Sequence, residues 1–133
     1  MLIEDNQTDV LLVKAAIAAH GPDLELQVIE NGEQAAGFIA RIDADETVAC
    51  PRLFLLDVNL PRMSGFEVLA RLRQSKRCAS LPVIVMTSSE ATRDRAESAA
   101  LGATAYFPKP FGYEGFLRIG EVIHELLASR EPS

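Results

Sequence analysis

The sequence RLFLLDVNLPRMSG spans residues 52–65 and contains an unbroken apolar run, Leu53–Leu56, that ends at Asp57. A half-exposed strand alternates apolar and polar side chains, so the unbroken run predicts a strand buried on both faces, as in a parallel sheet. Pro61 and Gly65 interrupt the pattern before an amphipathic helix begins. Ligands of such sheets bind at the carboxyl ends of the strands, where Asp57 would lie. Taken alone, the stretch is equally compatible with a turn residue that only ends a strand.

Length and charge narrow the class of protein. The chain has 133 residues, and we expect residues 1–133 to form one domain. A net charge of −6 argues against non-specific nucleic-acid binding, which needs a basic face. No apolar segment is long enough to cross a bilayer, and the first residues lack the basic region of a signal peptide. Cys50 and Cys78 have neither a CxxC nor a metal-site spacing, so we expect reduced thiols and a cytoplasmic location.

Strand and helix patterns alternate five times along the chain. Strands are predicted at residues 1–3, 24–29, 53–56, 81–86 and 103–107. The first predicted helix starts within residues 6–9, and the third starts at a capping box at 64–67. The second and fourth predicted helices span residues 33–42 and 90–101. The last helix has four apolar residues on one face: Phe116, Ile119, Ile123 and Leu126. Alternation of this kind predicts an α/β fold with a doubly wound parallel sheet and helices on both faces. The flavodoxin-like strand order 2-1-3-4-5 is the most common one for five strands.

This strand order would bring several polar side chains together. Glu4, Asp5 and Asp57 would meet at the ends of the first and third strands, beside Thr87 and Lys109 from the fourth and fifth. Three carboxylates so close cannot all stay ionised unless a cation neutralises them. Oxygen ligands without His or Cys favour Mg²⁺. A cation, an ammonium and a hydroxyl around a carboxylate meet the needs of phosphoryl transfer, with Asp57 as the nucleophile.

Each of these residues also has an ordinary structural role. Glu4 and Asp5 fit a helix start, Thr87 fits an N-cap, Lys109 fits a surface charge, and Tyr106 fits a strand interior. Their occurrence together, at or beside the ends of the predicted strands, favours the functional interpretation over five separate coincidences.

The segments IEDN, LLDVNLPRMSG, VIVMTSS and AYFPKPF resemble the receiver domain of bacterial two-component response regulators. The resemblance covers almost the whole chain and implies that Asp57 accepts a phosphoryl group from the phosphohistidine of a histidine kinase or a histidine phosphotransfer protein. It implies that Asp5 and Asp57 bind Mg²⁺ with the backbone carbonyl of Asn59, while Glu4 acts through water. Such a protein is no enzyme in the usual sense, because it catalyses only its own phosphorylation and dephosphorylation.

The same resemblance assigns the remaining site residues. Lys109 would contact the phosphoryl oxygens, and its bond to Pro110 is usually cis in the family. Thr87 and Tyr106 occupy the positions of the switch hydroxyl and the switch aromatic residue. The surface made by the fourth helix, fifth strand and fifth helix would form a homodimer or partner contact. The opening IEDNQTDVLLVKAAI resembles most the small single-domain receivers paired with bacterial phytochromes and related sensor kinases.

Three other functions compete with a signalling response regulator. The chain could act as a phosphate shuttle or sink without an output of its own. A flavin-binding electron carrier has the same fold, but it needs a Ser/Thr/Gly-rich phosphate loop after the first strand, where this chain has acids. A small phosphatase with an Asp nucleophile usually has a second Asp two residues later, where this chain has Asn59.

Overall fold

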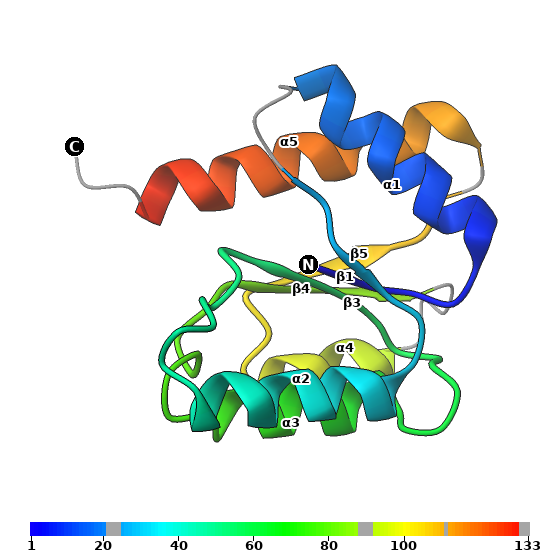
Figure 1. Cartoon of the computed structure of the whole chain (residues 1–133). Coiled ribbons are helices and arrows are strands. Elements are labelled where there is room, and N and C mark those ends of the chain that lie inside the picture. Colours follow the sequence, from blue (N-terminus) through cyan, green and yellow to red (C-terminus); the bar gives the residue numbers. More distant parts are fainter. Residues whose placement is uncertain (21–24, 88–91, 111, 131–133) are drawn as a thin grey trace.

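A computed structural model describes residues 1–20, 25–87, 92–110 and 112–130 of the chain. Within these ranges five parallel strands form one sheet in the order β2-β1-β3-β4-β5, as predicted (Figure 1). The strands are β1 (Leu2–Ile3), β2 (Val28–Ile29), β3 (Phe54–Asp57), β4 (Val83–Thr87) and β5 (Ala105–Pro108). The register pairs Ile3 with Leu56 and Asp57 with Met86, so the carboxyl ends of the strands meet at one edge.

The helices cover both faces of the sheet, which makes the fold doubly wound. They are α1 (Gln7–His20), α2 (Gly32–Ala44), α3 (Gly65–Arg73), α4 (Thr92–Ala100) and α5 (Tyr113–Arg130). Figure 1 shows α1 and α5 on one face and α2, α3 and α4 on the other. None of the helices, as far as they are described, is both long and apolar enough to span a membrane.

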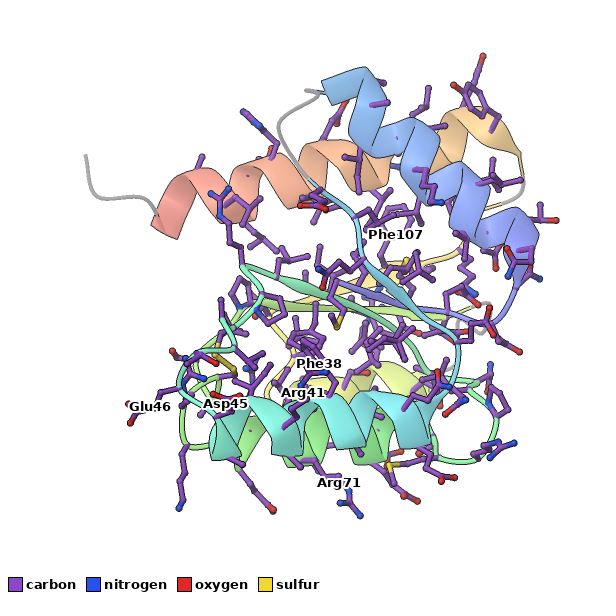
Figure 2. All side chains as sticks on the ribbon, in the orientation of Figure 1. Phe38, Arg41, Asp45, Glu46, Arg71 and Phe107 are labelled. Atoms are coloured by element: carbon purple, nitrogen blue, oxygen red, sulfur yellow. A yellow bond between two sulfur atoms is a disulfide. The ribbon has the colours of Figure 1, made fainter. Side chains whose placement is uncertain are left out.

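Strand β3 is buried on both faces, which confirms the interpretation of the apolar run. Phe54 and Leu56 pack in the core under α2 and α3, and Leu55 packs in the core under α1 and α5. Figure 2 shows side chains filling the space between the sheet and each helix layer, with Phe38 on the α2 side and Phe107 on the α5 side. Burial of these apolar side chains is the main source of stability in such a domain.

Glycine allows close packing of α3 against the end of β3. A Cβ atom at Gly65 would collide with the backbone carbonyl oxygen of Asp57. Ser64 caps the helix, since its Oγ accepts a hydrogen bond from the Glu67 backbone N–H at 3.3 Å, which is one half of the predicted capping box. The Gly65 N–H donates to the Val58 carbonyl at 2.9 Å, so the loop returns at once to the strand end and fixes the backbone around Asp57.

Several predicted boundaries were wrong by a few residues. Strand β2 has only two residues because β1 offers only two partners, and the predicted residue 24 lies outside the described ranges. Helix α2 extends to Ala44, and residues 90–91 of the predicted fourth helix also lie outside those ranges. In α5 the buried face continues from Ile123 to Leu127, one helical turn later, while Leu126 is only half-buried.

The expectation of reduced thiols was also wrong, because Cys50 and Cys78 form a disulfide. Hydrogen bonds of Asp43 and Arg77 also hold the same two segments together. The Asp43 carboxylate accepts from the Ser75 hydroxyl at 2.6 Å, and the Arg77 guanidinium donates to the carbonyls of Ile42, Asp45 and Val48 at 2.7, 3.0 and 2.6 Å. The bridge joins residues 28 positions apart, and only the tertiary fold brings them together.

Candidate functional site

The predicted acidic residues meet at the carboxyl edge of the sheet. Asp57 ends β3 and is 4% exposed, and Glu4 follows β1 and is fully buried, whereas Asp5 is exposed. One oxygen from each of these three carboxylates lies within 4.8 Å of the others. The Asn59 backbone N–H donates to Asp57 Oδ1 at 3.2 Å, while the metal contact expected from the Asn59 carbonyl stays a prediction. The arrangement concentrates negative charge at one point.

Lys109 brings a positive charge into this cluster. Its backbone N–H donates to the Thr87 carbonyl at 2.7 Å, which holds the residue beside the end of β4. Its Nζ lies 3.3 Å from Asp57 Oδ2 and 2.8 Å from Glu4 Oε2. The bond to Pro110 is trans, so the expectation of a cis bond was wrong; trans is the lower-energy form of an X–Pro bond, and Lys109 reaches the carboxylates with it.

Burial and neighbouring charges shift the pKa values at this edge. Burial raises the pKa of Glu4 to about 7; the Lys109 ammonium beside it opposes this increase and the Asp57 carboxylate adds to it. Burial acts to lower the pKa of Lys109, but its contacts with Asp9, Glu4 and Asp57 outweigh burial and raise that pKa above its ordinary value. Lys109 is therefore a permanent cation, while Glu4 can hold a proton when no other cation is bound.

The cluster fits a hard divalent cation. Glu4 Oε1 accepts from the Asn6 backbone N–H at 3.2 Å, but the buried Oε2 atom has no hydrogen-bond partner among the described residues. Lys109 Nζ is close enough to Oε2 for an ion pair, and the angles do not make that contact a hydrogen bond. An unpartnered buried oxygen beside two other carboxylates suits Mg²⁺ or Mn²⁺, which prefer oxygen ligands and would neutralise the cluster.

The two predicted switch residues lie on neighbouring strands. Thr87 ends β4 and is fully buried, and Tyr106 in β5 is paired with Val85 of β4 and is half-buried. The guanidinium of Arg95 in α4 lies 5.0 Å from the centre of the Tyr106 ring, a cation–π contact. The structure thus places Thr87 at the end of the strand next to β3 and Tyr106 on the following strand, and their role in switching stays a prediction.

Asp9 is a site residue that the sequence reasoning did not identify. It lies in the first turn of α1, and its Oδ2 accepts a hydrogen bond from Lys109 Nζ at 2.8 Å. Its position in the pattern EDN-x-x-D was a usable signal, because the turn after the first strand starts at the same edge of the sheet as Glu4 and Asp5. The helix dipole favours an acid in the first turn of any helix, so the sequence alone gives Asp9 no functional assignment.

Comparisons with known proteins agree with this geometry. The model of the response regulator receiver domain matches residues 1–119. Response regulator Rcp1 of Synechocystis sp. is 34% identical over 109 residues, which are 82% of this chain and 74% of Rcp1. The probable methanogenesis regulatory protein FilR2 of Methanothrix harundinacea is 30% identical over 125 residues, which are 94% of this chain and 80% of FilR2.

Solved structures give the same result. The Mn²⁺-bound form of Rcp1 has a TM-score of 0.83 at 29% identity and covers 98% of this chain and 94% of its own. The phosphorylated cyanobacterial phytochrome response regulator RcpA has a TM-score of 0.85 at 28% identity, with the same coverage of 98% and 94%. The structural similarity thus extends over 94% of each of these two solved chains. The chain belongs to the family of response regulator receiver domains.

Proposed function

We propose that this chain is a response regulator that accepts a phosphoryl group on Asp57, with Mg²⁺, and signals through a phosphorylation-dependent protein contact. The observation that carries the proposal is the nearly buried Asp57 carboxylate with Lys109 Nζ at 3.3 Å and two further acids beside it. The family membership supports it, because receiver domains are phosphorylated signalling domains that bind Mg²⁺ or Mn²⁺ at an acidic site.

The chemistry follows from the groups present. An oxygen of Asp57 forms a bond to phosphorus, the P–N bond of the donor phosphohistidine breaks, and the electron pair of that bond returns to the imidazole. Lys109 would stabilise the negative charge on the phosphoryl oxygens. A divalent cation held by Asp5, Asp57 and the Asn59 carbonyl, with Glu4 acting through water, would neutralise the remaining charge. The chain would catalyse only its own phosphorylation and dephosphorylation.

The phosphoryl group would be sensed through Thr87 and Tyr106. The phosphoryl group adds strong acceptor oxygens at Asp57. Thr87 ends the adjacent strand β4, so its hydroxyl could donate a hydrogen bond to one of these oxygens. Movement of that hydroxyl would leave room for the Tyr106 ring, which would then leave its contact with Arg95 of α4. We therefore propose the face of α4, β5 and α5 as the contact with a partner or a second copy of the chain.

The proposed partner is a sensor histidine kinase of the phytochrome class or a histidine phosphotransfer protein. The similarity to RcpA, a phytochrome response regulator, supports this class of kinase. We propose that residues 1–133 act as one receiver domain in the cytoplasm, without contacts to nucleic acid or membrane. Because Cys50 and Cys78 form a disulfide, reduced thiols no longer support the proposed cytoplasmic location.

Transfer from a kinase tests the proposal. Candidate kinases are phosphorylated with ATP and mixed with the wild-type chain, with Asp57→Asn or with the exposed control Asp45→Asn. The mass of each intact product is then measured by mass spectrometry. We expect one phosphoryl group on the wild type and the control and none on Asp57→Asn. Equal labelling of Asp57→Asn would contradict the proposal.

Three further observations separate the competing functions. Passage of the label from the chain to a second histidine-containing protein, without a change in self-association or in partner binding, would favour a shuttle or sink. A flavin carrier would be coloured when purified. That alternative has little support, because Glu4, Asp5 and Asp9 occupy the edge where a flavin phosphate would bind. A phosphatase would turn over a general phosphate ester.

A further inference from the structure

We propose that Asp9 is a positioning residue for Lys109, and that it keeps Glu4 and Asp57 available to a divalent cation by holding the ammonium group toward α1. This inference rests on the metal site of the proposed function. It concerns an acidic residue in the first turn of α1.

The geometry of the ammonium group carries the inference. Nζ lies 2.8 Å from Asp9 Oδ2 and equally 2.8 Å from Glu4 Oε2, but only the Asp9 contact has the angles of a hydrogen bond. Asp57 Oδ2 is more distant, at 3.3 Å. A charge-assisted hydrogen bond is directional, so one N–H of the ammonium points to Asp9 of α1, while the charge stays in ion-pair contact with Glu4 and Asp57.

Asp9 is itself held in a fixed place. Its backbone N–H donates to Asn6 Oδ1 at 3.1 Å, and the Asn6 N–H donates to Glu4 Oε1 at 3.2 Å. The following residues Val10 and Val13 are buried against the sheet. The side chains of Asp9 and Lys109 are 17% and 12% exposed, so bulk water screens their contact little.

Lys109 and a divalent cation compete for the negative charge of the same two carboxylates, Glu4 and Asp57. Without Asp9, the partners of the ammonium within the described part of the chain would be Glu4 and Asp57, and a cation would have to displace it from both. With Asp9 present, the ammonium keeps a partner when the cation takes Glu4 and Asp57. Asp9 thus favours binding of the cation in two ways: it provides a partner for Lys109, and its own negative charge attracts the cation.

Calorimetric titration with Mg²⁺ alone tests this role without any phosphorylation. We expect Asp9→Asn to raise the Mg²⁺ dissociation constant about fivefold, the ordinary size of coupling within one ion-pair network. Asp9→Glu, which keeps the carboxylate, should recover most of that loss. The control Asp94→Asn, which removes an acid from the first turn of α4, should leave the constant nearly unchanged. Should Asp9→Asn unfold, Asp9→Ser provides the same loss of carboxylate.

A double-mutant cycle distinguishes positioning from simple charge. In a Lys109→Met background, Asp9→Asn is expected to change the Mg²⁺ dissociation constant by less than half the factor seen with Lys109 present. An equal effect in both backgrounds, or no effect of Asp9→Asn on the wild type, would overturn the inference. Phosphorylation of Asp57 is measured separately, so a failure of phosphotransfer with intact Mg²⁺ coupling would count against the proposed function and leave the role of Asp9 standing.

Discussion

The change Glu4→Gln should flatten the pH dependence of stability in the metal-free protein. Glu4 is fully buried, and burial raises its pKa from an ordinary value of 4.5 to about 7. The folded state therefore holds a proton at pH values where the unfolded chain has lost it. A glutamine at this position cannot titrate, so the variant lacks the pH-dependent part of the free energy of unfolding that comes from Glu4. This holds even if the substitution also changes the stability at every pH.

The direction and the size of the effect follow from these two pKa values. Below about pH 4.5 both states carry the proton, and the full stability is present. As the pH rises toward 7, the unfolded state gains free energy from ionisation and the folded state does not, so stability falls. The difference between 4.5 and about 7 corresponds to a loss of about 3 kcal/mol.

Urea unfolding in the presence of a chelator measures this loss. The free energy of unfolding is compared at about pH 4.5 and about pH 7 for the wild type, Glu4→Gln and the control Glu46→Gln, whose side chain points outward in Figure 2. We expect a decrease for the wild type and Glu46→Gln that exceeds the decrease for Glu4→Gln by about 3 kcal/mol. Parallel pH profiles for all three proteins would refute the assignment of a protonated Glu4.

Three further outcomes are expected. Millimolar Mg²⁺ should raise the melting temperature at low ionic strength, because it relieves repulsion among the carboxylates, and Asp5→Asn should reduce that increase. A melting temperature that does not respond to Mg²⁺ would contradict the metal site. Reduction of the disulfide Cys50–Cys78 should lower the free energy of unfolding by about 3.5 kcal/mol, since the bridge closes a loop between residues 28 positions apart. A Cys50→Ser/Cys78→Ser variant should show no response to the reductant. Beryllofluoride should change hydrogen exchange within residues 87–113, and changes confined to α2 and the loop after it would contradict the proposed switch surface.

Strand patterns sufficed to predict most of the site. The unbroken run before Asp57 indicated a central parallel strand, and the commonest strand order then placed Glu4 and Asp5 beside it. These predictions depend on local pattern and on chain topology, which the sequence carries directly. The exposed Asp5 and the buried Glu4 could not be told apart, because two adjacent acids look alike until the fold shows which one faces the core.

Contacts between distant segments were not predictable in the same way. The Cys50–Cys78 bridge depends on how the loop after α2 meets the turn after α3, and no spacing rule describes that meeting. The bond between Lys109 and Asp9 joins residues 100 positions apart. In α5 the choice of Leu127 over Leu126 depends on the helix rotation against the sheet, since both leucines fit an apolar periodicity.

The most direct test of the central claim is the mass of the intact protein after incubation with a small acyl phosphate and Mg²⁺. Asp57 is nearly buried beside Lys109, so the account predicts the gain of a single phosphoryl group on the wild type. The gain should disappear in Asp57→Asn and when a chelator removes Mg²⁺. Labelling of Asp57→Asn to the same extent as the wild type would contradict the account.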